Sequence, residues 1–333
     1  MTGPLLFLLL PMVSAALAYG LRRWRSLPSL LAAGVSLALG LALLWVPFDC
    51  TITVFGRELV LGGATDLLGR TLVFEPSARA WMAFLFLTGA ALFLLAWRLE
   101  PEGLFAPLGL GLLGLLVGVL LVRPLIYAAL LLQIAAVLSI FPLQADPRSP
   151  VRGGLRYLTF FTLALPGLLV SHWLLDMYAV TPDQAGLLSA ATGLIGFSFA
   201  LMLGVVPFHP WVPAVGRDGG PLASAFLFSA SGGTVWFLLL TYLQTYPWLV
   251  DHPQWSSVFT VVGVLTAVVG GLLGTARRGP GRLMGYAVMV DTGVLLVGLG
   301  QSSRTGVELG AAVVFARALS VALMGAGMAL LVW

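Results

Sequence analysis

Apolar stretches of about 20 residues recur along the whole chain, and they constrain its fold more than any other feature. A helix needs about 20 apolar residues to cross a hydrocarbon core roughly 30 Å thick. Eleven such stretches start near residues 4, 27, 80, 104, 124, 152, 187, 221, 255, 283 and 306. Because only 9% of the 333 residues are charged and 59% are hydrophobic, too little polar side chain remains for a water-facing surface. The sequence therefore predicts a polytopic membrane protein.

The spans are predicted to be α-helices, so the fold class is all-α with about eleven transmembrane helices. Each span must satisfy its own backbone hydrogen bonds in lipid, and the stretches are too long and too uniformly apolar for barrel strands. The largest extramembrane segment is residues 47–78. Within it, residues 51–61 alternate around Phe55 and Gly56, which predicts a short β-hairpin between the second and third helices.

The arginine distribution predicts the orientation of the chain in a cell membrane. Eleven of the 17 basic residues fall in the loops after the first, third, fifth, seventh and ninth spans, and only five fall in the opposite loops. Since cytoplasmic loops collect arginine, we predict a cytoplasmic location for the first set and an outside location for the N-terminus. The pI of about 9.6 then reflects topology and not a nucleic-acid partner, because the charges are scattered over loops.

A proline-rich stretch interrupts the seventh apolar segment. Residues 205–215 read VVPFHPWVPAV. Pro207 cannot donate to the helix ladder and crowds the preceding turn, so a break is predicted at Pro207 and Pro210. In lipid, freed carbonyls need partners, and such a break usually marks a functional interior. His209 is predicted to cap these carbonyls, with proton transfer as the alternative role.

At this point several motifs, taken together and in order, resemble the antiporter-like subunits of respiratory complex I and their relatives in membrane-bound hydrogenases and multisubunit cation/proton antiporters. Residues 206–213, VPFHPWVP, are similar to the family's PFHxWLP stretch at its interrupted seventh helix. Residues 220–227, GPLASAFL, resemble the start of its eighth helix, and 281–293, GRLMGYAVMVDTG, the opening of its tenth. The segments LRYL at 155–158 and FEPSARA at 74–80 also fit.

The resemblance implies an antiporter-like fold built from two five-helix repeats. On this pattern residues 1–103 form three N-terminal helices with the hairpin loop, and residues 104–244 form a complete first repeat with the interrupted helix near Pro207. Residues 255–333 then form a second repeat that we expect to be truncated, because the family usually continues to fourteen helices.

The family's proton relay is missing from this sequence. The resemblance implies buried titratable groups at mid-membrane: a glutamate in helix five, lysines in seven and eight, and a lysine or glutamate in twelve. Here the glutamate falls on Gln133, the first lysine on Met202 and the second near Gly232 or Phe228, while a histidine common in helix ten falls on Asp291. The chain contains no lysine at all, since its 17 basic residues are all arginine, which keeps its proton.

Asp291 and Arg317 are the ionisable residues expected near mid-membrane. At 1.5 Å per helical residue their depths are compatible, so a structural ion pair is predicted, with a surviving proton step as the alternative. Gln133 is expected to form hydrogen bonds in the former channel without exchanging protons. His172 is expected at the membrane interface. One cysteine and three dispersed histidines predict no metal site.

These observations favour an antiporter-like membrane subunit of a complex I-type, NADH-quinone oxidoreductase-like assembly that has become a non-pumping scaffold. Its partners would be other membrane subunits, both antiporter-like and redox-arm, together with the lipid bilayer. No nucleic acid, no cofactor in this chain and no catalysis by the chain alone are expected. Two alternatives stay open: ion or proton translocation through Asp291 and His209, and membership of a solute-uptake complex built on the same fold.

Overall fold

The computed structural model describes residues 3–24, 26–47, 51–54, 57–60, 63–67, 69–99, 104–144, 151–181, 183–246, 248–249, 253–276, 279–301 and 304–332. Within these ranges ten helical segments are long and apolar enough to span a membrane, and a 17-residue apolar helix adds an eleventh. The predicted all-α fold with about eleven transmembrane helices is therefore confirmed.

The helices follow the predicted segments closely. Their bounds are α1 Gly3–Gly20, η1 Leu21–Arg23, α2 Leu27–Trp45, α3 Pro76–Leu99, α4 Phe105–Leu121, α5 Ile126–Leu143, α6 Arg152–Val180, α7 Ala185–Leu203, α8 Trp211–Asp218, α9 Pro221–Phe226, the π-helical turn η2 Leu227–Ser231, α10 Gly232–Thr245, α12 Pro253–Ala276, α13 Pro280–Leu299 and α14 Arg304–Val332.

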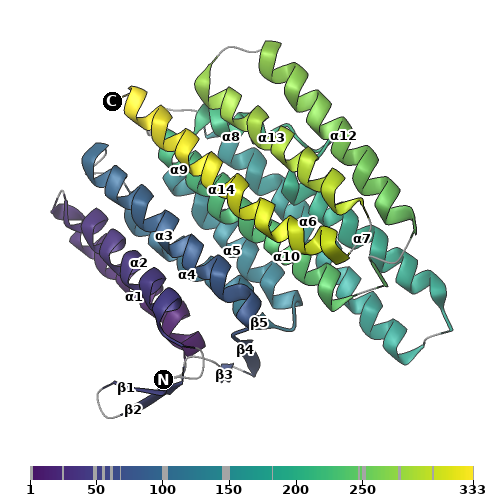
Figure 1. Ribbon diagram of the computed structural model, residues 1–333, viewed down its shortest axis with the longest axis horizontal. Helices are drawn as coiled ribbons and strands as arrows, with labels where there is room; N and C mark the ends of the chain where they lie inside the picture. Colours follow the sequence, from purple (N-terminus) through teal and green to yellow (C-terminus); the bar gives the residue numbers. More distant parts are fainter. Residues whose placement is uncertain are drawn as a thin grey trace.

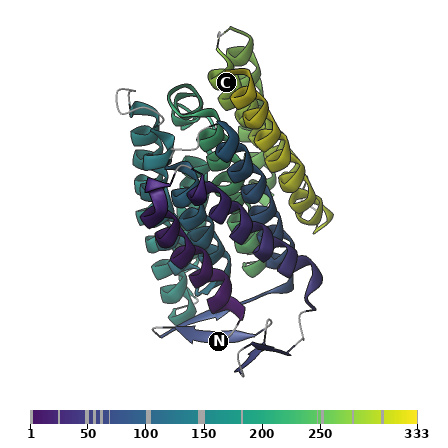
Figure 2. The ribbon, with the colours of Figure 1, turned by 90° about the vertical axis from the view of Figure 1, so that its left-hand side faces the viewer.

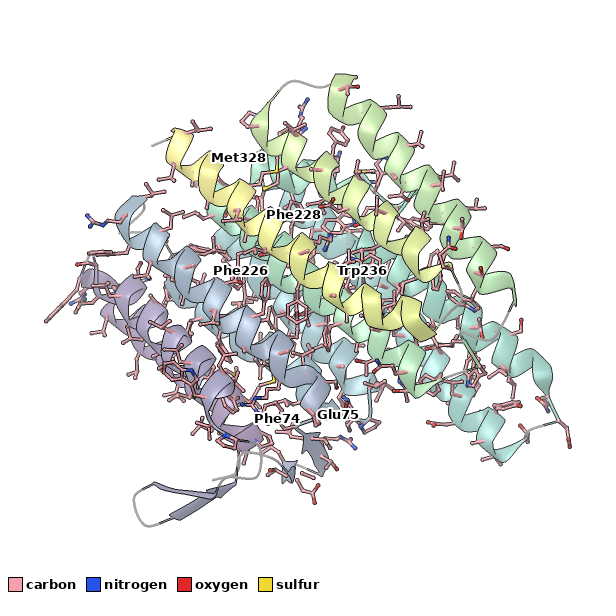
Figure 3. The ribbon with its side chains drawn as sticks, viewed as in Figure 1. Phe74, Glu75, Phe226, Phe228, Trp236 and Met328 are labelled. Carbon is pink, nitrogen blue, oxygen red and sulfur yellow. The ribbon has the colours of Figure 1, made fainter. Side chains whose placement is uncertain are left out.

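The helices form a bundle with α1 and α2 at one edge and α12 at the other (Figure 1). The two chain ends lie at opposite ends of the bundle, and the short strands gather at the end that holds the N-terminus (Figure 2). The eighth span, α9–η2–α10, lies at the centre of the bundle. In its apolar 18-residue window 89% of the residues are buried, whereas in the corresponding window of α12 only 17% are buried. Phe226, Phe228 and Trp236 lie in this centre beneath α14 (Figure 3).

The loop after α2 forms more β-structure than the sequence predicted. β1 (Thr51–Val54) and β2 (Arg57–Val60) pair antiparallel, as expected, with the predicted turn residues Phe55 and Gly56 outside the described residues. A second antiparallel pair, β3 (Ala64–Leu67) and β4 (Arg70–Val73), is joined by the two-residue β5 (Val122–Arg123). This three-stranded sheet ties the loop to the segment between α4 and α5.

Two spans are irregular, and both line the same interior. The seventh is interrupted, as the prolines predicted: α7 ends at Leu203, Gly204 adopts a left-handed backbone at φ +65°, and helix resumes only at Trp211. The eighth contains the π-helical turn η2, which the sequence did not reveal. π-bulges inside α-helices are often found at functional sites.

Tight glycine contacts set the packing around α8. Gly285 in α13 lies so close to α8 that an added Cβ would stand 2.7 Å from the Pro213 Cα atom and 2.9 Å from the Val212 carbonyl oxygen. On the other side of α8, an added Cβ at Gly153 in α6 would stand 2.8 Å from the carbonyl carbon of Ala214. The short helix is thus held between α6 and α13 at backbone contact.

Candidate functional site

The helix break is closed by a tryptophan and a threonine. The indole Nε1 of Trp211, the first residue of α8, donates to the Leu201 carbonyl in the last turn of α7 at 3.2 Å. The Val206 backbone N–H donates to the Thr266 hydroxyl of α12, also at 3.2 Å. These two backbone groups at the break therefore find side-chain partners inside the protein, as a span in lipid requires.

His209 was predicted to cap the carbonyls freed at the break. It lies at one of them, that of Pro207, whereas the donor at the Leu201 carbonyl is Trp211. Its imidazole is partly buried close to the Pro207 backbone, but the Nδ1 atom has no hydrogen-bond partner in the part of the chain that the structure describes. Pro207 and Pro210 are exposed on either side of it. The sequence showed where the helix breaks, but it could not show which neighbouring side chain reaches the freed carbonyl.

A cavity of about 20 Å³ lies beside the break, lined by residues of α6, α7, α8, η2, α10, α13 and α14. Aromatic and apolar side chains make up most of its lining, and Ser231 and Arg317 add polar atoms. Met202, Phe228 and Gly232 also line it. The three residues on which the sequence comparison placed the family's two lysines thus line one cavity, and the one charged group among its described lining residues is the Arg317 guanidinium.

The Arg317 side chain reaches this cavity from α14 and is 93% buried. Its Nη2 atom lies 3.4 Å from the Thr292 hydroxyl oxygen, while Nε and Nη1 find no acceptor among the described residues. An added Cβ at Gly232 would stand 3.9 Å from Nη1, so the guanidinium fills the space beside the eighth span. A residue from the eleventh span thus reaches the cavity that Met202 of α7 and Phe228 of η2 also line.

Asp291 and Arg317, the predicted ion pair, attract one another but are not in direct contact through a salt bridge. The two charges attract one another across the contact of α13 with α14. The Asp291 carboxylate makes no direct salt bridge with the guanidinium, whose hydrogen bond goes to the next residue of α13, Thr292. The side chain of Asp291 is only partly buried, and it is not among the cavity-lining residues.

Gln133 lies apart from this cluster. Its Nε2 atom donates to the Thr162 hydroxyl at 2.8 Å and so links α5 to α6, and its Oε1 atom has no partner among the side chains and backbone that the structure describes. The predicted hydrogen-bonding role is thus realised with a neighbouring helix, and no proton can pass through an amide by exchange at neutral pH.

A buried histidine–tyrosine contact was missed by the sequence. His172 is 93% buried within the protein, and its predicted place at the membrane interface stays a prediction. Its Nδ1 lies 2.9 Å from the Leu168 carbonyl oxygen and its Nε2 lies 3.3 Å from the Tyr242 hydroxyl. If Nδ1 carries the proton, Nε2 accepts from the tyrosine, so both ring nitrogens are satisfied. Neighbouring residues in sequence gave no signal for a partner 70 positions away.

At the end of α8, outside the spans, Arg217 and Asp218 form an ion pair. The Arg217 Nη2 atom donates to an Asp218 carboxylate oxygen at 2.7 Å, and a second hydrogen bond joins Nε to the other oxygen. These hydrogen bonds are the main cause that holds the pKa of Asp218 below its usual value. A hydrogen bond from the Gly153 backbone and the positive charge of Arg156, both in α6, lower this pKa further. The carboxylate thus connects the end of α8 to the start of α6.

We expect Asp218→Asn to lower the free energy of unfolding by less than about 1 kcal/mol at pH 7, since Arg217 is 39% exposed. A pKa lowered by folding gives stability that is present above about pH 3.9 and is lost as the pH falls through the folded-state value. In thermal unfolding in lipid nanodiscs, the gap between variant and wild type should therefore be larger at pH 7 than near pH 3. The exposed Asp183→Asn is the control, and an equal gap at both pH values would contradict the prediction.

Comparisons with known proteins found a matching family profile and several relatives. The family profile described as NADH:quinone oxidoreductase/Mrp antiporter, TM, matches residues 167–331. NADH-quinone oxidoreductase subunit N of Rhodospirillum rubrum is 26% identical over 196 residues, which make up 55% of this chain and 40% of that protein. Subunit N 1 of Roseiflexus castenholzii is 29% identical over 294 residues, or 75% of this chain and 53% of that protein. The chain spans about half the length of these curated relatives or less.

Solved structures of multisubunit membrane complexes share the fold. A chain of the Mrp complex from Dietzia sp. DQ12-45-1b superposes with a TM-score of 0.73 at 18% identity, covering 94% of this chain and 36% of that one. A chain of respiratory complex I from Thermus thermophilus with bound NADH superposes with a TM-score of 0.69 at 20% identity. The match covers 97% of this chain and 70% of that one. At these identities the likeness shows the fold alone.

The profile match covers the interrupted helix, the π turn, Asp291 and Arg317. The sequence resemblance is thereby confirmed. Residues 167–331 match the profile of the NADH:quinone oxidoreductase/Mrp antiporter transmembrane family, and the chain as a whole has the antiporter-like fold.

Proposed function

We propose that this chain is an antiporter-like, subunit N-like membrane subunit of a complex I-type NADH-quinone oxidoreductase, and that it serves there as a scaffold that does not pump protons. The observation that carries the second part is the Arg317 guanidinium in the cavity lined by Met202, Phe228 and Gly232. Arginine keeps its proton in any protein environment, so it cannot release and regain one as a relay lysine does.

A fixed charge at this place also opposes the passage of cations. Inside a protein the effective dielectric is far below that of water, so a buried positive charge raises the electrostatic energy of any second cation that approaches it. The described residues that line the cavity include neither lysine nor carboxylate. A proton arriving from either side therefore meets repulsion and no side chain that can carry it onward.

The proposed partners are other membrane subunits. The relatives named above are subunits of NADH-quinone oxidoreductases, and the structural neighbours belong to Mrp, complex I and an archaeal membrane-bound sulfane sulfur reductase complex. In such an assembly electron transfer and quinone chemistry would belong to subunits other than this chain. Iron–sulfur proteins should co-purify with it, whereas a solute-uptake complex would lack them.

The competing function, translocation through Asp291 and His209, is separated from the scaffold by one variant in the intact complex. We expect Asp291→Asn to leave the number of protons moved per NADH oxidised unchanged, because the relay does not run through this subunit. The measurement is proton uptake into inverted membrane vesicles beside NADH oxidation, with assembly verified by native gel electrophoresis. Loss of pumping in a fully assembled Asp291→Asn complex would establish translocation instead.

A further inference from the structure

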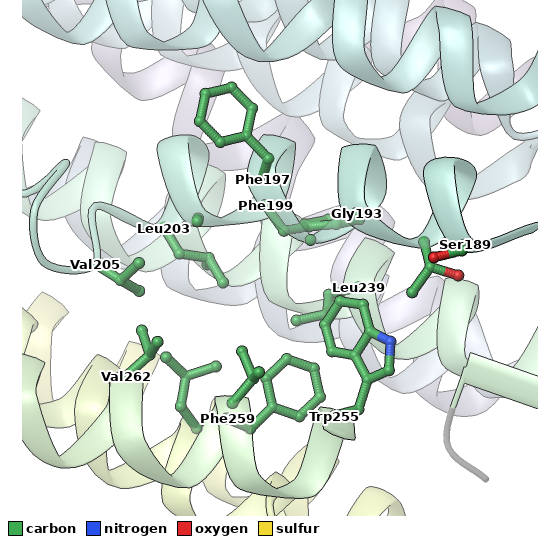
Figure 4. A pocket seen from close by; sticks show the side chains of 15 residues that line it. Ser189, Gly193, Phe197, Phe199, Leu203, Val205, Leu239, Trp255, Phe259 and Val262 are labelled. Atoms are coloured by element: carbon green, nitrogen blue, oxygen red, sulfur yellow. The ribbon is translucent and has the colours of Figure 1, made fainter. Parts of the chain in front are cut away.

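A second and larger cavity, of about 350 Å³, opens between α7 and α12. Side chains from both helices point into it, with α10 and α13 closing its floor (Figure 4). We name it the α7–α12 crevice. Its walls include the apolar side chains Phe199, Leu203, Val205, Trp255, Phe259 and Val262. It is separate from the cavity at Arg317, although Leu203 borders both.

The chemistry of the α7–α12 crevice suits an apolar ligand. Its described lining contains no charged residue, and its polar side chains are Ser189 and Thr192, both near the start of α7. The Thr192 hydroxyl already donates to the Leu188 carbonyl at 2.7 Å. Polar atoms are therefore confined to the end of the crevice near the membrane surface, and the deeper part is hydrocarbon-like.

The crevice is long, narrow and open to lipid. From Ser189 to Leu203, a rise of 1.5 Å per residue gives a length of about 21 Å, which exceeds half of a hydrocarbon core roughly 30 Å thick. Its volume is far too small for another transmembrane helix, which is about 10–12 Å across. The α12 wall is the least buried span, and Val258 at the rim is 49% exposed.

We propose that the α7–α12 crevice binds one acyl chain of a membrane phospholipid. The ester end lies near Ser189, where a hydroxyl meets the more polar zone of the membrane. The methyl end lies against Leu203 and Val205, at the point where α7 ends and the helix break begins. The bound chain then fills the apolar space beside the break and excludes water from that side. This site does not depend on whether the subunit pumps protons.

Glycine gives a variant that blocks the crevice without disturbing the fold. Gly193 lines the crevice, is exposed, and has no atom within 4 Å of the place where its Cβ would stand. Gly193→Phe therefore places a ring in the ligand's space. Gly271 in α12 is equally open but lies outside the crevice, so Gly271→Phe is the matched control.

The experiment uses the purified full chain in nanodiscs that contain phosphatidylethanolamine with a photoactivatable diazirine at the end of one acyl chain. After illumination, cross-linked residues are identified by mass spectrometry. We expect wild type and Gly271→Phe to label at Leu203, Val205 and Val262. Labelling at these residues should fall at least fivefold in Gly193→Phe, while circular dichroism and gel filtration show a native fold.

Three results would overturn the proposal. One is labelling spread evenly over the outward-facing α12 residues Val261 and Val268, which would indicate ordinary lipid contact. Another is crevice labelling that Gly193→Phe leaves unchanged. The third is the absence of lipid labelling at Leu203, Val205 and Val262 in the assembled complex, which would mean that another subunit covers the crevice.

Discussion

Gly285→Ala is expected to lower the free energy of unfolding by about 1–3 kcal/mol, the range for overpacking in a closely packed interior. In a helix this change normally gains about 0.5–1 kcal/mol, because glycine loses more backbone freedom on folding than alanine does. Here the new methyl group would meet the Pro213 Cα atom at 2.7 Å and the Val212 carbonyl oxygen at 2.9 Å. Both belong to the backbone of α8, so no side chain can turn away to make room.

The matched control lies in the same helix. Gly298 has no atom within 4 Å of an added Cβ and is exposed, so Gly298→Ala should be neutral or stabilise the chain by up to about 1 kcal/mol. The comparison is made by thermal unfolding of both variants in nanodiscs of one lipid composition. A gain in stability for Gly285→Ala would show that α8 is not packed at backbone contact against α13.

The double variant Arg317→Met/Asp291→Asn, which removes both charges, is expected to raise the free energy of unfolding by about 1–4 kcal/mol. Replacing buried charges by uncharged side chains of similar size is often neutral or stabilising by that amount. The gain should lie toward the stabilising end, because two guanidinium nitrogens have no acceptor among the described residues and the one hydrogen bond, to Thr292, is long at 3.4 Å. Thermal unfolding in nanodiscs again provides the measurement.

The single variants test the coupling within this pair. Arg317→Met removes the positive charge that attracts the partly buried Asp291 carboxylate. Asp291→Asn removes the negative charge that attracts the Arg317 guanidinium. Each single variant should therefore be less stable than the double variant, and the effects should not add. A double variant less stable than both singles would mean that the charges stabilise the fold through contacts other than their mutual attraction.

The sequence was sufficient to predict the spans, the hairpin and the break. Each of these features is encoded locally: a span by about 20 apolar residues, the hairpin by alternation across residues 51–61, and the break by Pro207 and Pro210. Such features depend on covalent geometry and on transfer from water to lipid. Neither requires knowing which helix lies beside which.

The contacts that complete the site could not be read in the same way. The Leu201 carbonyl is ten residues from Trp211, Val206 is 60 residues from Thr266, and His172 is 70 residues from Tyr242. Each pairing depends on the helix arrangement and on side-chain direction. Compatible depths suggested a pair between Asp291 and Arg317, but depth alone did not show that the guanidinium would bond to the neighbouring Thr292.

The π-helical turn Leu227–Ser231 determines the rotational phase of the rest of its span. Each residue of an α-helix advances the chain by about 100° around the axis. Had this turn one residue fewer, α10 would present a different face to its neighbours, and Gly233 would no longer lie beneath the Trp81 indole, whose Nε1 donates to Thr234 at 3.3 Å. The wide turn thus sets an angular offset that brings Gly233 and Thr234 of α10 against Trp81 of α3, while α9 on the other side of the turn packs against α14.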